Sequence, residues 1–297
     1  MKFKNSQTDL IEFRGREIYI KRDDKLDVDF SGNKARKLYY YLVNEFPNIK
    51  RVVSYGSNQS NAMYSISALA KLRGWEFIYY LNHIPKYLKS NPIGNYKYAL
   101  RNGMIVKVSN ERPKQEDFDS STLFIEEGGR QLEARFGLKI LADEILEWQK
   151  RNYIERLNIF LPSGTGTTAL FLQKYLYENG REHQATVYTT PSVGDENYLK
   201  LQFNMLEADE LKHPTTLKPP KKYHFGKLYR ELYLVWRDVL RETNIEFDLL
   251  YDPVGWITLL NSPDILNSNR PLLYIHQGGL IGNESMLERY RRKFPDI

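Results

Sequence analysis

Strand-like and helix-like patterns alternate along most of the chain. Continuous or alternating apolar residues are typical of β-strands, whereas apolar residues spaced by three and four indicate helices. The strands predicted in this way are residues 17–21, 51–55, 77–81, 104–108, 122–125, 158–161, 185–190 and 272–275. The predicted helices are residues 33–46, 61–73, 93–101 and 228–241, a long one containing Leu138, Leu141, Ile145 and Trp148, and one from about Thr168. Residues 211–223 are rich in Pro and Lys and are predicted to form a loop.

This order of elements predicts the fold class. A repeated strand–helix order favours mostly parallel sheets covered by helices, which is an α/β fold. The polar stretch 109–121 interrupts the order and is the best candidate for a crossover between two domains. Because ligands of parallel sheets bind at the carboxyl ends of the strands, the loops that follow strands are the informative ones.

Composition narrows the class of protein. The 297 residues are 41% hydrophobic and 27% charged, which predicts a globular protein of two domains or one large one. The absence of Cys excludes disulfides, thiol catalysis and Cys-based metal sites, and the five His residues lack metal-ligand spacing. There is no signal-peptide pattern and no apolar run near the ~18 residues that cross a bilayer. We therefore expect a cytoplasmic protein with no metal and no membrane partner.

The net charge of +6 permits a polyanionic partner without requiring one. Basic residues are interleaved with acidic ones along the chain. The basic cluster at 288–293 suits the end of a helix, where cations interact favourably with the helix dipole. We therefore expect no nucleic-acid partner.

The loop at 162–168 has the composition of a phosphate site. It reads Pro162-Ser163-Gly164-Thr165-Gly166-Thr167-Thr168 and leads into a helix. Glycines let backbone N–H groups turn toward one point, and the helix N-terminus adds free donors and a partial positive charge. The Gly-Lys-Ser/Thr ending of a P-loop is absent. An ordinary turn with a helix cap is the alternative.

A second loop, residues 55–61, gathers small polar side chains after an apolar strand. Ser57, Asn58, Gln59 and Ser60 would bring short donors and acceptors to a sheet edge, which suits a carboxylate or a ring hydroxyl. The alternative is a cluster that caps the following helix.

The third candidate loop, residues 31–37, places Lys34 in the first turn of a helix. A positive charge is unfavourable there, and a Schiff base that consumes the amine would explain the lysine. Lys37 lies three residues later on the same face and could neutralise a phosphate. A pair of solvated lysines is the alternative.

A series of motifs in the same order resembles the 1-aminocyclopropane-1-carboxylate deaminase / D-cysteine desulfhydrase family. The family's Lys-Arg-Asp-Asp and Gly-Gly-Asn-Lys-x-Arg-Lys-Leu correspond to Lys21-Arg22-Asp23-Asp24 and Ser31-Gly32-Asn33-Lys34-Ala35-Arg36-Lys37-Leu38. Its Gln-Ser-Asn-Gln and Ser-Gly-Ser-Gly-Gly-Thr correspond to Gly56-Ser57-Asn58-Gln59 and Ser163-Gly164-Thr165-Gly166-Thr167-Thr168. Its late Asp-Pro-Val and His-Thr-Gly-Gly correspond to Asp252-Pro253-Val254 and His276-Gln277-Gly278-Gly279. The matches span nearly the whole chain.

The resemblance implies a fold and a cofactor. The family consists of pyridoxal 5′-phosphate (PLP) enzymes of fold type II, the fold of the tryptophan synthase β subunit. It implies two three-layer α/β/α domains with mostly parallel twisted sheets and PLP in the cleft between them. The large domain would comprise residues 1–37 and 122–297, and the small domain residues 38–121. A homodimer is also expected.

The resemblance also implies a role for each matched residue. Lys34 would bind PLP covalently and move protons at the substrate α-carbon, and Ser57 would lie beside the reacting carbon. Asn58 would bind the 3′ oxygen of PLP, and Gln59 the substrate carboxylate, so that Ser57, Asn58 and Gln59 contact the substrate. The phosphate would be held by Lys37 and by Gly164, Thr165, Gly166, Thr167 and Thr168. Gln277 would give the pyridine nitrogen a neutral hydrogen bond.

The sequence departs from the family pattern after Asp252-Pro253-Val254. The deaminases continue with Tyr-Glu and the desulfhydrases with Tyr-Thr, whereas this chain continues with Gly255-Trp256. A second active-site tyrosine aligns with Phe225, or with Tyr223 if the alignment slips. We therefore expect β-elimination and deamination of a small amino acid, as in D-cysteine desulfhydrase, giving an α-keto acid and ammonia. Cyclopropane ring opening and a PLP- or metabolite-binding protein without turnover are the alternatives.

Overall fold

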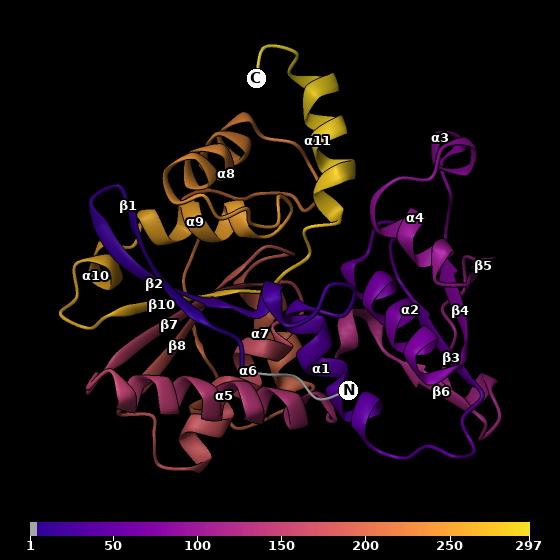
Figure 1. Cartoon of the computed structure of the whole chain (residues 1–297), viewed down its shortest axis with the longest axis horizontal. Coiled ribbons are helices and arrows are strands. Elements are labelled where there is room, and N and C mark those ends of the chain that lie inside the picture. The colour runs from indigo at the N-terminus through magenta and orange to yellow at the C-terminus, as the bar shows by residue number, and fades with distance from the viewer. Residues whose placement is uncertain (1–4) are drawn as a thin grey trace.

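The computed structural model describes residues 5–297, so that residues 1–4 of the expected large domain lie outside the described part. Two sheets organise the chain (Figure 1). The smaller sheet is entirely parallel, and its strand order is β5 (Met104–Val108), β4 (Glu76–Leu81), β3 (Arg51–Tyr55) and β6 (Thr122–Ile125).

Helices cover one face of this small sheet. α1 (Gly32–Val43), α2 (Asn61–Arg73) and α4 (Gly94–Arg101) pack on the strands through one apolar core, and the short α3 (Lys86–Ser90) lies nearby. The other face packs against the segment between β5 and β6, where the Phe118 ring stacks on the Phe124 ring. The second helical layer predicted for the small domain is therefore replaced by this segment.

The larger sheet has the order β1 (Thr8–Phe13), β2 (Arg16–Arg22), β10 (Leu272–His276), β7 (Leu157–Ser163), β8 (Ala185–Pro191) and β9 (Thr215–Thr216). β1 and β2 are antiparallel, and the other pairs are parallel. One face packs on α5 (Ala134–Arg151) and α6 (Thr167–Glu178). The opposite face packs on α8 (Arg230–Thr243), α9 (Asp252–Leu260) and α11 (Gly282–Lys293), as Figure 1 shows. This is the predicted three-layer arrangement.

The fold class predicted from the sequence is confirmed, with one correction to the expected domain bounds. The prediction placed residue 122 at the beginning of the large domain. β6 instead pairs in parallel with β3, because its apolar residues complete the small sheet. The chain therefore crosses to the large sheet after Ile125.

Several elements were not predicted. They are β1, β9, α3, α7 (Glu196–Asn204), α9, α10 (Pro263–Leu266), the body of α11 and four 3-10 turns at Asp23–Lys25, Gln115–Asp117, Glu127–Gly129 and Glu210–Lys212. Among residues 5–297, none of the helices is long and apolar enough to cross a membrane.

Candidate active site

A cavity of about 350 Å³ lies where the carboxyl ends of strands from both sheets meet. Its walls come from the loops after β3, β7 and β10 and from the first turns of α1 and α2. The structure brings together all but one of the sequence-predicted residues around it. These are Lys34, Lys37, Ser57, Gln59, Gly164, Thr165, Gly166, Thr167, Thr168 and Gln277.

The turn that carries Lys34 is fixed against the end of β10. Gly32 has φ +68, and the Asn33 N–H donates to the Gln277 main-chain oxygen at 3.0 Å. The Asn33 side-chain amide donates to Gln277 Oε1 at 2.8 Å, and Gln277 Nε2 donates to the Pro162 carbonyl oxygen at 2.6 Å. Two of the family-like motifs, far apart in sequence, therefore hold one another in place.

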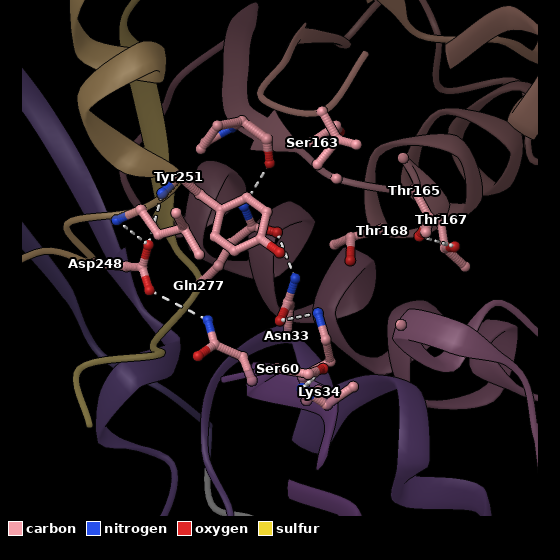
Figure 2. Close-up of a pocket in the computed structure, with 18 of the residues that line it drawn as sticks. Asn33, Lys34, Ser60, Ser163, Thr165, Thr167, Thr168, Asp248, Tyr251 and Gln277 are labelled. Carbon is pink, nitrogen blue, oxygen red and sulfur yellow. Dashed lines mark hydrogen bonds between the residues drawn. The ribbon is translucent and has the colours of Figure 1, made fainter. Parts of the chain in front are cut away.

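The Lys34 amine points into the cavity, 3.3 Å from Asn33 Oδ1 (Figure 2). Desolvation lowers its pKa from 10.5 to about 8, and the charge of Asp248 opposes that shift. A neutral amine is the nucleophilic form, so Lys34 is closer to reactivity at neutral pH than an ordinary lysine is.

A buried ion cluster anchors the helix that carries Lys34. The Arg36 guanidinium forks between Asp23 of the turn after β2 and Glu144 of α5, with bonds of 2.8 Å to each. Lys21 Nζ also donates to Glu144, at 2.7 Å. Since removing one partner of a buried ion pair costs about 3–5 kcal/mol, this cluster ties α1 firmly to the large sheet.

The Gly/Thr loop at the other end of the cavity has the features of an anion site. Gly166 has φ +70 immediately before α6, and a Cβ there would lie 2.4 Å from Phe203 Cε1. Thr165 and Thr167 share a hydrogen bond of 3.0 Å, whereas the buried Thr168 hydroxyl lacks any partner among residues 5–297. The helix N-terminus and the free hydroxyl together suit a bound phosphate.

Lys37 brings a second amine to the end of the cavity that the Gly/Thr loop forms. Its side chain is 3% exposed, and its Nζ donates to the Gly128 carbonyl oxygen at 3.1 Å. Desolvation lowers its pKa well below 10.5, and the charges of Lys34 and Arg130 lower it further. A phosphate in the cavity would offset this cost, because an opposite charge favours the protonated amine.

The structure corrects the expectation for Asn58. Its side chain donates to the His83 carbonyl oxygen at 3.2 Å and lines a separate groove, not the cavity. Ser60, a member of the predicted polar cluster to which the family resemblance gave no role, and Asn61 line the cavity instead. The Gln-Ser-Asn part of the family motif also matches Gln59-Ser60-Asn61, three residues later. Because Ser-Asn occurs twice in this loop, the alignment of the loop with the family motif was ambiguous.

Two further cavity residues were missed. Asp248 and Tyr251 precede the Asp252-Pro253-Val254 motif, and only the residues after that motif were compared with the family. Burial raises the pKa of Asp248 to about 6 despite its hydrogen bonds. Burial and the charge of Asp248 also raise the pKa of the Tyr251 phenol, so that it remains protonated.

Packing explains the departures after Val254. A Cβ on Gly255 would lie 2.8 Å from Tyr274 Oη and 3.2 Å from Pro162, which leaves no room for tyrosine. Trp256 is a core residue whose ring stacks on Tyr274 at 4.5 Å.

The aromatic side chains at the cavity come from other positions. Phe225 lines the cavity with its ring 5.3 Å from that of Tyr251. Tyr223 packs in a separate apolar cluster with Leu232 and Val254. Of the two alignments that the sequence left open, the one that uses Phe225 therefore agrees with the structure.

This fold, with its site between the two sheets, is that of the fold type II PLP enzymes. The crystal structure of a homologue of 1-aminocyclopropane-1-carboxylate deaminase matches with a TM-score of 0.78 at 20% identity. The match covers 96% of this chain and 93% of that one.

The curated relatives carry the names of both branches of the expected family. A Pyrococcus furiosus protein named for 1-aminocyclopropane-1-carboxylate deaminase is 24% identical over 290 residues, which cover 90% of this chain and 86% of that protein. D-cysteine desulfhydrase of Serratia proteamaculans is 24% identical over 294 residues, which cover 91% and 88%. No protein-family model matches the chain. The chain therefore resembles this family along about nine-tenths of its length, as its motifs predicted.

Proposed function

We propose that this protein is a PLP-dependent enzyme that eliminates a β-substituent from a small amino acid and releases an α-keto acid and ammonia. The observation that carries the proposal is the pairing of two features in one cavity. The desolvated amine of Lys34 lies on one side, and the Gly/Thr loop at the beginning of α6 lies on the other (Figure 2).

The residues present fit the cofactor. Among residues 5–297 the buried hydroxyl of Thr168 has no hydrogen-bond partner, and burying such a group without a hydrogen bond costs free energy. A phosphate oxygen would satisfy it. A phosphate would also give the buried amine of Lys37 a counter-charge that offsets the effect of Lys34 and Arg130. We assign the phosphate to the backbone of Gly164 to Thr168, the three threonine hydroxyls and Lys37.

PLP, when bound, supplies an electron sink for bonds broken at the substrate α-carbon. Lys34 is assigned the covalent attachment through its neutral amine. With PLP and a substrate bound, Lys34 would accept the α-proton of the substrate, since a pKa near the working pH suits an acid–base group. The bond from the β-carbon to the leaving group breaks with its electron pair, and the leaving group is protonated. One water then completes the products: cysteine and water give pyruvate, sulfide and ammonia.

Gln277 lies on the side of the cavity that we assign to the pyridine ring of PLP. Its amide oxygen accepts from Asn33 and one of its two N–H groups donates to Pro162, so at most one N–H remains for a ligand. We assign that N–H to the pyridine nitrogen. A neutral donor leaves the ring a weaker electron sink than an acid would, which favours expulsion of a good leaving group.

We assign Ser60 and Asn61, rather than Ser57 and Asn58, to the substrate side. Ser60 begins α2 and its oxygen accepts from the N–H groups of Ala62 and Met63 at 3.2 and 3.4 Å. When the family motif Gln-Ser-Asn-Gln is aligned with Gln59-Ser60-Asn61-Ala62, Ala62 takes the position of the glutamine that the family would use for the substrate carboxylate. Because those N–H groups already have an acceptor, the Ser60 hydroxyl is the donor that we assign to that carboxylate.

Cyclopropane ring opening is a second candidate reaction because of Tyr251. Its protonated phenol lines the cavity and could act as the proton donor that Gly255 cannot supply. Elimination remains the better-supported reaction, because the acidic residue of the deaminase branch is replaced by the core residue Trp256.

The setting of the enzyme is also part of the proposal. We propose a homodimer in the cytoplasm that acts on a small amino acid, and only the choice of a small amino acid is supported by the names of its relatives.

A keto-acid assay tests the proposal. D-cysteine, L-cysteine, D-serine, β-chloro-alanine and 1-aminocyclopropane-1-carboxylate are supplied to the PLP-loaded protein, and pyruvate or α-ketobutyrate is measured. We expect pyruvate from D-cysteine or β-chloro-alanine and little α-ketobutyrate. Strong turnover of the cyclopropane substrate would favour the Tyr251 alternative. PLP binding without turnover of any substrate would contradict the proposed reaction.

Two serine variants test the assignment of the substrate side in the same assay. Ser60→Ala should lower turnover more than Ser57→Ala while both retain the cofactor spectrum. The reverse order would return the role to Ser57.

A further inference from the structure

The carboxylate of Asp248 is held at the edge of the cavity by groups from both parts of the molecule. Its side chain is 2% exposed. Oδ1 accepts the N–H groups of Leu250 and Tyr251 at 2.8 and 2.6 Å, and Oδ2 accepts from Asn61 Nδ2 at 3.2 Å. Figure 2 shows this carboxylate on the same cavity as Lys34 and Ser60. Asp248 thus presents a fixed acceptor from the segment before α9 to the beginning of α2.

The contact continues into the small sheet's helices. Asn61 Oδ1 accepts from Asn95 Nδ2 at 2.6 Å, and Asn95 Nδ2 also donates to the Gln59 carbonyl oxygen at 3.0 Å. Asn95 belongs to α4 and is 1% exposed. A buried row of polar groups therefore joins the large part of the molecule to α2 and α4.

The glycine at position 279 makes room for this row. A Cβ on Gly279 would lie 2.6 Å from Asn61 Nδ2 and 2.7 Å from Asp248 Oδ2. The Gly278-Gly279 end of the late motif is therefore explained by the close approach of Asp248 and Asn61, as well as by its turn.

Asp248 is also the acidic group that acts on Lys34. Its charge favours the protonated Lys34 amine, and the charge of Lys34 favours the ionised carboxylate. Tyr251, Asp252 and Tyr274 are further titratable groups around Asp248, and burial together with the charge of Asp248 raises the pKa of each. Lys37 faces Lys34 along α1, and its pKa is itself lowered. Asp248 and Lys34 line the same cavity as an acidic and a basic group.

We propose that Asp248 is a positioning residue that fixes Asn61 at the cavity and holds a negative charge on the same cavity as the Lys34 amine. The effect of Asp248 on catalysis rests on the proposed function. In that function Asp248 favours the protonated, positively charged form of the Lys34 amine. It also orients Asn61, whose second amide N–H remains available to a ligand. A group that shifts the charge on the attachment lysine sets the pH range over which the site works.

The experiment measures the pKa of Lys34 in the full chain after any bound carbonyl compound has been removed, so it does not depend on PLP binding or turnover. Lys34 is labelled with trace acetic anhydride between pH 6 and 11, and its labelled fraction is measured by peptide mass spectrometry. Wild-type Lys34 should titrate at about 8. In Asp248→Asn the pKa should fall by about one unit or more, so that Lys34 is labelled about fivefold faster at pH 7.

Three variants separate this effect from loss of structure. Glu127→Gln removes another carboxylate that lines the cavity and should leave the Lys34 titration unchanged. Asp248→Glu should restore much of the wild-type pKa. Asp248→Ser can still accept the Leu250 and Tyr251 N–H groups, and it replaces Asp248→Asn if that variant does not fold. An unchanged Lys34 pKa in folded Asp248→Asn or Asp248→Ser would overturn the proposal, as would an equal shift in Glu127→Gln.

Discussion

The main-chain oxygen of Gln277 occupies the space that a Cβ atom on Gly32 would need, 2.0 Å from that position. The same oxygen accepts the Asn33 N–H, so the turn before Lys34 and the end of β10 are in direct contact. Glycine at position 32 is required by this close approach and by its φ of +68.

Gly32→Ala should therefore displace Lys34. The left-handed backbone alone costs about 1–2 kcal/mol for alanine, and the contact with Gln277 must also open. We expect weaker PLP binding, seen as loss of the visible cofactor band, together with a lower melting temperature. Gly15→Ala is the matched control, because Gly15 has φ +71 with open space around it. If both variants retain the cofactor equally well, the close contact is not what places Lys34.

Two buried threonines should respond oppositely to substitution by valine. The Thr168 hydroxyl has no partner among the described residues, whereas Thr189 Oγ1 donates to the Leu161 carbonyl oxygen at 2.8 Å. Thr168→Val should keep the stability of the cofactor-free protein and weaken PLP binding about tenfold or more, since a hydrogen bond to a charged group contributes about 1.5–3 kcal/mol. Thr189→Val should lower the stability instead. Calorimetric melting and PLP titration measure both, and unchanged PLP affinity in Thr168→Val would place the phosphate elsewhere.

The attachment of PLP should depend on pH through Lys34. The neutral amine is the reactive form, and its pKa in the folded protein is about 8. Below that value the attachment rate should rise about tenfold per pH unit, and above it the rate should level off. In the unfolded chain the pKa is near 10.5, so the contribution of Lys34 to the free energy of unfolding rises with pH between about 8 and 10.5. Stopped-flow mixing with PLP measures the rate, and a rise continuing to pH 10 would mean that Lys34 is not desolvated.

Much of the fold could be predicted because apolar patterns and motif order agree. Strands such as Arg51–Tyr55 and Met104–Val108 end where the sequence predicts them. β1 was not predicted, because its adjacent Leu10 and Ile11 break the alternation of apolar and polar residues that indicates a strand. The placement of β6 could not be predicted, because a strand of four residues, three of them apolar, fits an edge of either sheet.

The candidate site was predicted less completely, for two physical reasons. Ser57-Asn58-Gln59 and Gln59-Ser60-Asn61 both match the same family motif, and only the direction of the Asn58 side chain toward His83 separates them. Asp248 carries no motif at all, because its role comes from its hydrogen bond to Asn61 and from the cavity that it shares with Lys34, and these residues are about 190 and 210 positions away in the chain. Such contacts exist only in the folded chain.

The most direct test of the account is the identity of the residue that binds PLP. The purified protein, loaded with PLP if necessary, is reduced with sodium borohydride, digested and analysed by mass spectrometry. We predict a yellow protein whose visible band disappears on reduction and whose pyridoxyl group is recovered on Lys34. A colourless protein that does not take up PLP, or a pyridoxyl group recovered on Lys37 or another lysine, would contradict the account.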